Sequence, residues 1–261
     1  MDMNGQSGSS GNEMIVVGLV HPRGSGGFSI RTPIWTLRFT FSAWRDANNV
    51  LHRTDLLVKG DMTHDQLNDL MKDIHSLSIV KVRIRNFNNG TAEFVELIDS
   101  NVETDRELNQ IAAEISQPLT YEHSRFGTFT FDRRVSWWQT SLEWVGQPIR
   151  LDLPGEADSP PDDDLLQTVT ELWNNQSLWN QRVMDFAVQE KLPLKNEMWL
   201  DDDEQPLSPD EFKARMSLES ISIYIEGGFA FWHDDGDLFF GHSILVTGNL
   251  QDGPTDTDIP G

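Results

Sequence analysis

One short segment near the C-terminus gathers most of the side chains that could do chemistry. They are His233, Asp234, Asp235 and Asp237, followed by His242. Three carboxylates and an imidazole on a tight turn could hold a divalent cation, or could place an acid beside a base. An Asp-Gly pair between two apolar runs is also the strongest short-range signal for a β-hairpin. The hairpin interpretation is favoured, and the identity of any metal stays unknown.

A two-residue Asp-Gly turn would fix the register of the strands on either side of it. Asp234 would then face Asp237, and His233 and His242 would share one face of the sheet, four residues apart along the strand. At about 3.3 Å per residue, the two imidazoles would lie roughly 13 Å apart, too far to bind one ion. A histidine in an apolar row is more often a hydrogen-bonded core residue than a ligand. Any metal site would need a ligand from elsewhere in the fold.

A basic row is the second candidate for binding. Two predicted strands, 79–87 and 91–98, would place Lys81, Arg83 and Arg85 on one outer face. This row could meet an anionic ligand, although a solvated sheet face explains the same pattern.

Nucleophilic catalysis has no support in the sequence. The chain has no cysteine, no GxSxG elbow and no HExxH motif. The glycines of residues 21–27 (HPRGSGG) do not lie between a strand and a helix in GxGxxG spacing, so they do not predict a phosphate cradle. No catalytic residue and no cofactor is therefore predicted.

Charge restricts the classes of partner. The 261 residues carry a formal net charge of −22, and after Glu122 nine basic residues stand against 26 acidic ones. Such a surface repels nucleic acid and anionic membranes and attracts basic partners, although it also serves solubility alone. No apolar run approaches the roughly 18 residues that span a bilayer, and the chain begins without a signal-peptide pattern. We expect a cytoplasmic protein, and the oligomeric state stays open.

The elements that would position these residues form two domains of class α+β, each an antiparallel sheet with helices packed on it. Residues 1–27 predict a disordered tail and loop, 28–102 an N-terminal α+β domain, 103–120 a helical connector, and 121–261 a C-terminal α+β domain. The C-terminal domain is expected to hold three strands, three helices and a three-stranded meander.

Three segments of the C-terminal half resemble a known family. They read FGTFTFDRR, WWQTSLEWVGQPIRLDL and SLESISIYIEGGFAFWHDDGDLFFGHSILVTGNLQDG. Over roughly residues 126–261 they are similar to the bacterial family called domain of unknown function 2262, which implies no established activity. The resemblance marks the following residues as characteristic: Trp144, Ser220, Asp235, Gly236, Asp237, Gly241, His242 and Gly248. Small acidic bacterial domains of this style look similar to immunity proteins that neutralise toxins, which is an analogy.

Two hypotheses of function follow. The first is a non-enzymatic binding protein, an immunity-like module whose acidic second domain covers a basic protein partner, with neither nucleic acid nor membrane as a partner. The alternative is a metal-dependent or acid/base enzyme that uses the turn from Asp234 to Asp237 together with His242. The candidate binding residues are Asp234, Asp235, Asp237, His242 and Trp144.

Overall fold

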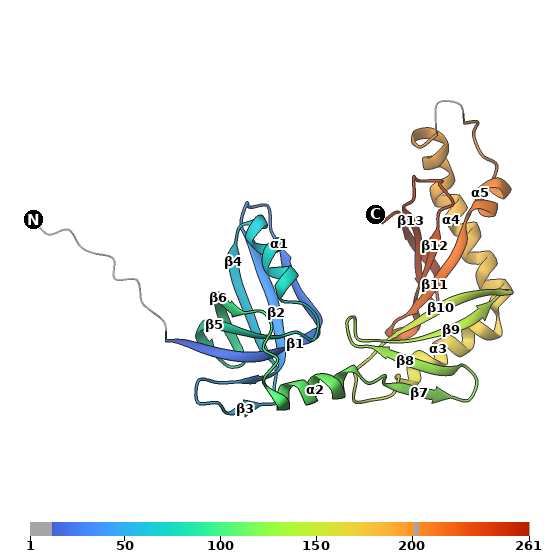
Figure 1. Cartoon of the computed structure of the whole chain (residues 1–261). Helices are drawn as coiled ribbons and strands as arrows, with labels where there is room; N and C mark the ends of the chain where they lie inside the picture. The colour runs from blue at the N-terminus through green and yellow to red at the C-terminus, as the bar shows by residue number, and fades with distance from the viewer. Residues whose placement is uncertain (1–11, 201–203, 261) are drawn as a thin grey trace, which may run out of the picture. The chain divides into compact units, whose positions relative to one another are not determined.

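The computed structural model describes residues 12–200 and 204–260, and the chain divides into two compact units, 1–117 and 118–261 (Figure 1). Each unit is built on a mostly antiparallel sheet, with six strands in the first and eight in the second. The predicted α+β class with two sheet domains is therefore confirmed. Within the described ranges, no helix combines the length and the apolar character needed to cross a membrane.

The N-terminal unit is a closed barrel. Its strands are β1 (Glu13–Phe28), β2 (Trp35–Arg45), β3 (Leu51–His52), β4 (Leu56–Met62), β5 (Ile79–Asn88) and β6 (Thr91–Asp99). The strand order is β1-β5-β6-β4-β2-β3, and β1 also pairs with β2, so that five strands close on themselves. Alternate side chains, including Phe39, Val58 and Val82, fill the interior.

Strand β1 corrects the predicted N-terminal boundary. Residues 21–27, expected as a loop, lie within this strand, and the domain begins before residue 28. The extra residues form a bulge against β2 between the pairs Val20–Phe41 and Ser25–Phe39, so the ladder continues on both sides of the glycines. Residues 1–11 of the predicted tail lie outside the described residues.

Helices α1 (His64–Asp73) and α2 (Arg106–Ser116) belong to the barrel unit. The capping box of Thr63 and Gln66 begins α1, as the sequence indicates. Helix α2 is not a free connector, because its apolar side chains Leu108 and Ile111 pack in one buried cluster with Leu19. The unit boundary consequently falls directly after Gln117.

The C-terminal unit holds one eight-stranded sheet. Its strands are β7 (Thr120–His123), β8 (Gly127–Asp132), β9 (Trp137–Trp144), β10 (Gln147–Pro154), β11 (Ser217–Ile223), β12 (Gly228–Asp234), β13 (Ser243–Asn249) and β14 (Gly253–Asp258). Neighbours in sequence pair antiparallel, except that β10 and β11 pair parallel across the middle. Each half thus has four strands where the sequence predicts three, because β7 and β14 are short and polar and lack an apolar alternation.

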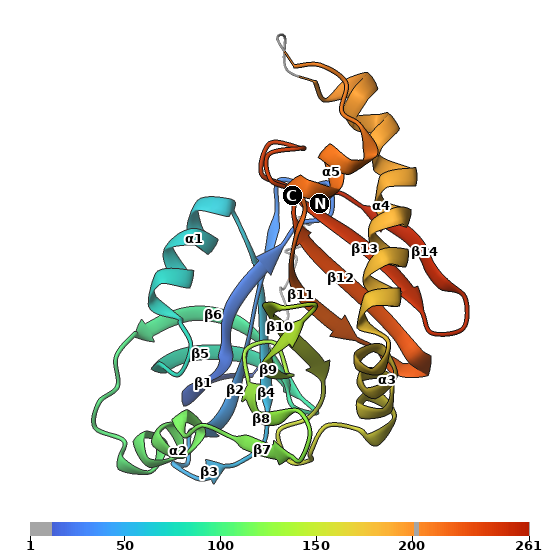
Figure 2. The same cartoon turned by 90° about the vertical axis from the view of Figure 1, so that its right-hand side faces the viewer.

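Three helices connect the two halves of this sheet, and α3 and α4 lie across one face of it (Figure 2). They are α3 (Asp163–Asn174), α4 (Gln176–Met198) and α5 (Pro209–Arg215). Their apolar sides bury the aromatic core of the unit, in which Trp179 meets Phe229 edge-on with ring centroids 5.3 Å apart. A single 3₁₀ turn, η1 (Ile225–Gly227), follows β11.

Candidate functional site

The segment with the three carboxylates is a long loop and not a tight turn. Asp234 pairs with Ser243 and His233 pairs with Ile244, so the connection between β12 and β13 covers residues 235–242. The predicted two-residue turn, with Asp234 facing Asp237, is therefore wrong.

The carboxylate of Asp235 explains why the chain prefers the longer loop. This side chain is buried and accepts hydrogen bonds from the backbone N–H groups of Asp237 (3.1 Å), Phe239 (2.6 Å) and Gly241 (3.3 Å). A short acidic side chain that satisfies its own loop in this way competes with a regular hairpin. Asp235 therefore organises the loop, and its oxygen atoms are already used.

The loop is also fixed to helix α5. Gly236 has a φ of 54°, and a Cβ atom there would lie 2.3 Å from the backbone oxygen of Arg215. The Arg215 guanidinium donates to the Gly236 carbonyl (2.9 Å) and pairs with Glu204 (2.9 Å), which also meets the buried Lys195 at 2.5 Å. The glycine is required by this close approach of two backbones.

The two histidines lie in different environments. His233 is buried on β12, and desolvation lowers its pKa to about 4. His242 lies in the loop, half-buried, with its ring edge-on to Trp199 at 5.9 Å. The predicted shared sheet face is wrong because β13 begins at Ser243, so His242 lies in the loop before this strand. Across the part of the chain that the structure describes, no group of three or more His, Asp or Glu side chains has the arrangement of a metal site.

Trp144 is a core residue. It is buried, its indole N–H donates to Asn180 Oδ1 (3.1 Å), and its ring packs edge-on against Trp173 and Phe231. It therefore lines no groove for a ligand.

The basic row is largely neutralised by the neighbouring strand. Arg83 pairs with Glu96 and Arg85 with Glu93, each with 2.8 Å between nitrogen and oxygen, while Lys81 lies opposite Asp99 in the ladder. Cross-strand ion pairs of this kind stabilise the sheet and leave little net positive field for an anion.

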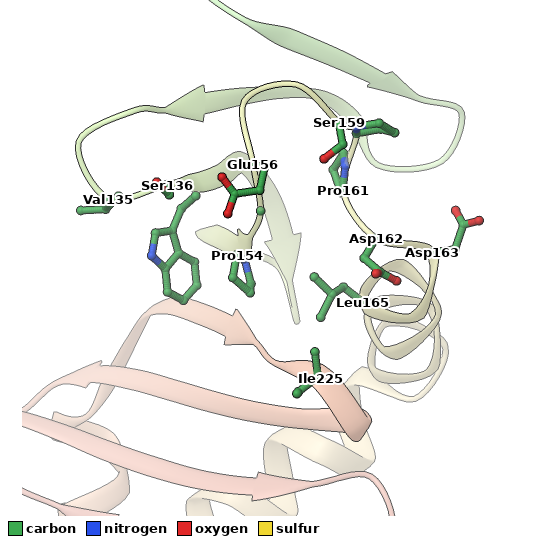
Figure 3. A pocket seen from close by; sticks show the side chains of 13 residues that line it. Val135, Ser136, Pro154, Glu156, Ser159, Pro161, Asp162, Asp163, Leu165 and Ile225 are labelled. Carbon is green, nitrogen blue, oxygen red and sulfur yellow. The ribbon is translucent and has the colours of Figure 1, made fainter. Parts of the chain in front are cut away.

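A surface hollow in the C-terminal unit brings together residues that the sequence analysis did not single out (Figure 3). Its volume is about 830 Å³, and it opens where β9 begins, where β10 ends and where the chain leaves β11. Trp137 pairs with Pro154 across these strands, and its ring meets that of Tyr224 edge-on at 5.9 Å. Val135 and Ile225 also line the hollow and are 51% and 72% exposed.

Acidic side chains surround this apolar surface. Glu156, Asp162 and Asp163 line the hollow, and all three are exposed. Asp162 also caps α3 by accepting from the backbone N–H of Asp164 (2.8 Å). Among the described residues that line the hollow there is no Lys, Arg or His. We call this feature the acid-rimmed hollow.

Comparison with known families agrees with the division into two units. Residues 123–259 match the family model of DUF2262, an uncharacterised protein conserved in bacteria, and this match covers more than half of the chain. The chain belongs to the DUF2262 family. Residues 8–115 match a second family model, DUF7021, a domain of unknown function. A search of curated proteins found no match.

Three of the residues that the resemblance marks as characteristic of DUF2262 have structural roles in this unit. Asp235 and Gly236 shape the loop, and a Cβ atom on Gly248 would lie 2.1 Å from the Gly253 carbonyl oxygen at the β13–β14 hairpin. These characteristic residues are therefore explained by the fold of the DUF2262 unit, without a reactive centre.

The sequence contained one signal for the acid-rimmed hollow. Trp137 and Trp138 are adjacent in one strand, so their side chains must point to opposite faces of the sheet. Trp138 is buried in the core, and Trp137 therefore lies on the other face, beside the hollow.

Proposed function

We propose that this protein is a non-catalytic, cytoplasmic binding protein whose DUF2262 unit receives a basic segment of a protein partner at the acid-rimmed hollow. The observation that carries the proposal is the combination of the half-buried Trp137 and the exposed Ile225 with three carboxylates, and with no Lys, Arg or His among the described lining residues. An immunity-like role, with a basic toxin as the partner, is one form of this function.

Exposed apolar side chains support a protein as the ligand. The exposed Val135 and Ile225 and the half-buried Trp137 all line one hollow and are not scattered singly over the surface. Grouped apolar side chains with a polar rim are typical of protein interaction sites, in which aromatic residues form the centre.

Charge supports a basic partner. The chain after Glu122 carries nine basic and 26 acidic residues, and the rim adds Glu156, Asp162 and Asp163 at the hollow itself. A Lys or Arg of the partner would gain attraction from these carboxylates and from the indole face of Trp137.

Site-specific crosslinking tests the location. A photoreactive benzoylphenylalanine in place of Val135, beside the hollow, is expected to capture a basic protein in the native host. The same residue in place of Val145, which is 47% exposed in the β9–β10 turn, is the matched control and should not capture it. Equal capture at the two positions would contradict the proposal.

Charge variants test the mechanism with the captured partner in purified form. Glu156→Gln combined with Asp163→Asn should weaken binding about tenfold, because rim charges steer and hold a basic segment. Glu219→Gln combined with Asp256→Asn removes the same charge from exposed strand positions and should leave the affinity nearly unchanged. If the two double variants lose affinity equally, the protein attracts its partner by net charge alone.

The alternative, an enzyme that uses the loop carboxylates with His242, has weaker support. Asp235 is committed to three backbone N–H groups, and Asp234 accepts from the Gly236 N–H at 2.9 Å. Thermal unfolding with and without added divalent cations tests its metal form, for which a cation would have to raise the unfolding temperature.

A further inference from the structure

The bulge in β1 creates a second hollow, in the DUF7021 unit. Residues 21–24 lie opposite the single residue Thr40 of β2, and Gly24 takes a φ of 71° to turn the chain back into the ladder. The backbone N–H of Arg23 donates to His21 Nδ1 (3.1 Å), and Ser25 Oγ donates to the Ile74 carbonyl (2.5 Å). Bulges of this kind often re-aim side chains beside a functional site.

This hollow has a volume of about 380 Å³ and a lining of basic residues and glycines. Arg23 and Arg38 line it together with Gly24 and Gly26, and Phe28, another lining residue, is 48% exposed. No carboxylate appears among the described residues that line it. Its volume falls within the range of sites for small molecules.

Arg38 differs from the arginines of the basic row. It is exposed on β2, and within residues 12–200 and 204–260 it makes no ion pair and no side-chain hydrogen bond. Lys59 lies beside it in the β2–β4 ladder and adds positive potential. The N–H donors of the Arg38 guanidinium are therefore available to a ligand, whereas those of Arg83 and Arg85 bind glutamates.

Gly26 leaves the approach to Arg38 open. The two residues face each other in the β1–β2 ladder, and a Cβ atom built on Gly26 would meet nothing within 4 Å. A glycine with free space above it permits a ligand to come close to the backbone of the sheet.

We propose that this hollow binds a phosphate-type oxyanion, either free or carried by a small organic molecule. The guanidinium of Arg38 supplies paired N–H donors that match two anion oxygens, and Arg23 adds a second positive charge. The site is not the glycine cradle that precedes a helix in nucleotide-binding folds, because its glycines lie in a bulged strand between two strands of a barrel.

Amide NMR spectra of the full chain, titrated with inorganic phosphate at constant ionic strength, test the proposal. We expect saturable shifts at the amides of residues 24–27, and about tenfold weaker binding in Arg38→Gln. Arg106→Gln removes the same charge from exposed helix α2 and should bind as the unmodified protein does. Equal weakening in the two variants, or shifts confined to Lys81, Arg83 and Arg85, would overturn the site.

A second variant keeps the charge and blocks the space. Gly26→Val places a side chain in the open region, where a strand tolerates it, and should abolish the shifts while the rest of the spectrum is preserved. Unchanged binding in Gly26→Val would also overturn the proposal. Phenyl phosphate separates the two sources of the anion: tighter binding that is lost in Phe28→Ala assigns an organic phosphate, and equal affinity assigns the free anion.

Discussion

The carboxylate of Asp235 accepts a hydrogen bond from the backbone N–H of Phe239 at 2.6 Å. Asp235 is buried, with 1% of its surface exposed. This contact places Phe239 in the core, where its ring meets that of Trp199 edge-on. A residue that appears reactive in the sequence thus fixes the path of eight residues between two strands.

Replacing Asp235 should destabilise the C-terminal unit. We expect Asp235→Asn to lower the free energy of unfolding by about 2 to 3 kcal/mol, because the buried amide cannot accept all three backbone hydrogen bonds and adds unpaired donors. Asp237→Asn is the control, since this exposed side chain makes none of them. Urea denaturation followed by tryptophan fluorescence measures both, with seven of the nine Trp in this unit. Equal stability of the two variants would contradict the assignment.

The close approach at Gly236 predicts a steric effect. Gly236→Ala should lower the free energy of unfolding by about 3 kcal/mol or more, because the added Cβ would meet the Arg215 carbonyl oxygen at 2.3 Å. Gly146→Ala is matched in having a positive φ, 81°, with nothing within 4 Å, and should cost only about 1 kcal/mol of backbone strain. The difference between their unfolding free energies measures the clash alone.

His233 predicts a loss of stability in mild acid. Burial lowers the pKa of His233 from 6.5 to about 4, so between these values the folded imidazole stays neutral while the unfolded chain binds a proton. The stability contributed by the neutral form is present above pH 6.5 and is lost as the pH falls toward 4. The free energy of unfolding should drop by about 3 kcal/mol over this window.

The slope of stability against pH identifies the group. Denaturation series from pH 7 to about 4.5 should show a flatter slope in His233→Leu than in the unmodified protein. His75→Gln, at an exposed position of the barrel unit, should keep the full slope. A slope that persists in His233→Leu would assign the acid sensitivity to other groups.

Trp144 should matter for stability and not for binding. Trp144→Ala removes a buried ring and leaves Asn180 without its indole partner. We therefore expect the free energy of unfolding to fall by about 3 to 5 kcal/mol. Trp137→Ala, on the other face of the sheet, should cost far less stability but weaken partner binding. The opposite pattern would mean that Trp144 reaches a ligand.

Much of the fold could be predicted because local signals were strong. Thr63 with Gln66 and Ser208 with Glu211 have the residue types and the spacing of a capping box, and α1 and α5 begin at these positions. The polar strand β14, GPTDTD, has no apolar alternation and is held by pairing with β13. That pairing is a tertiary contact which local patterns do not contain.

The loop between β12 and β13 was harder to predict, because hydrogen bonds from one side chain outweigh the local turn signal. The Asp-Gly pair predicts a two-residue turn, but Asp235 offers its loop three hydrogen bonds that such a turn lacks. The acid-rimmed hollow depends on Glu156 and Ile225, which lie 69 residues apart and meet only in the folded sheet. The spacing of residues along the sequence therefore could not predict that the two are neighbours.

The parallel pair of β10 and β11 has a consequence for how the larger sheet could be divided. Residues 120–154 and 217–258 are two antiparallel stacks, each contiguous in the gene, and they meet through Arg150, Leu151 and Asp152 beside Ser220, Ile221 and Ser222. A chain cut between these stacks would yield two fragments that share the short β10–β11 pairing and the aromatic core. Two fragments that reassemble through such an interface have the design of a split reporter.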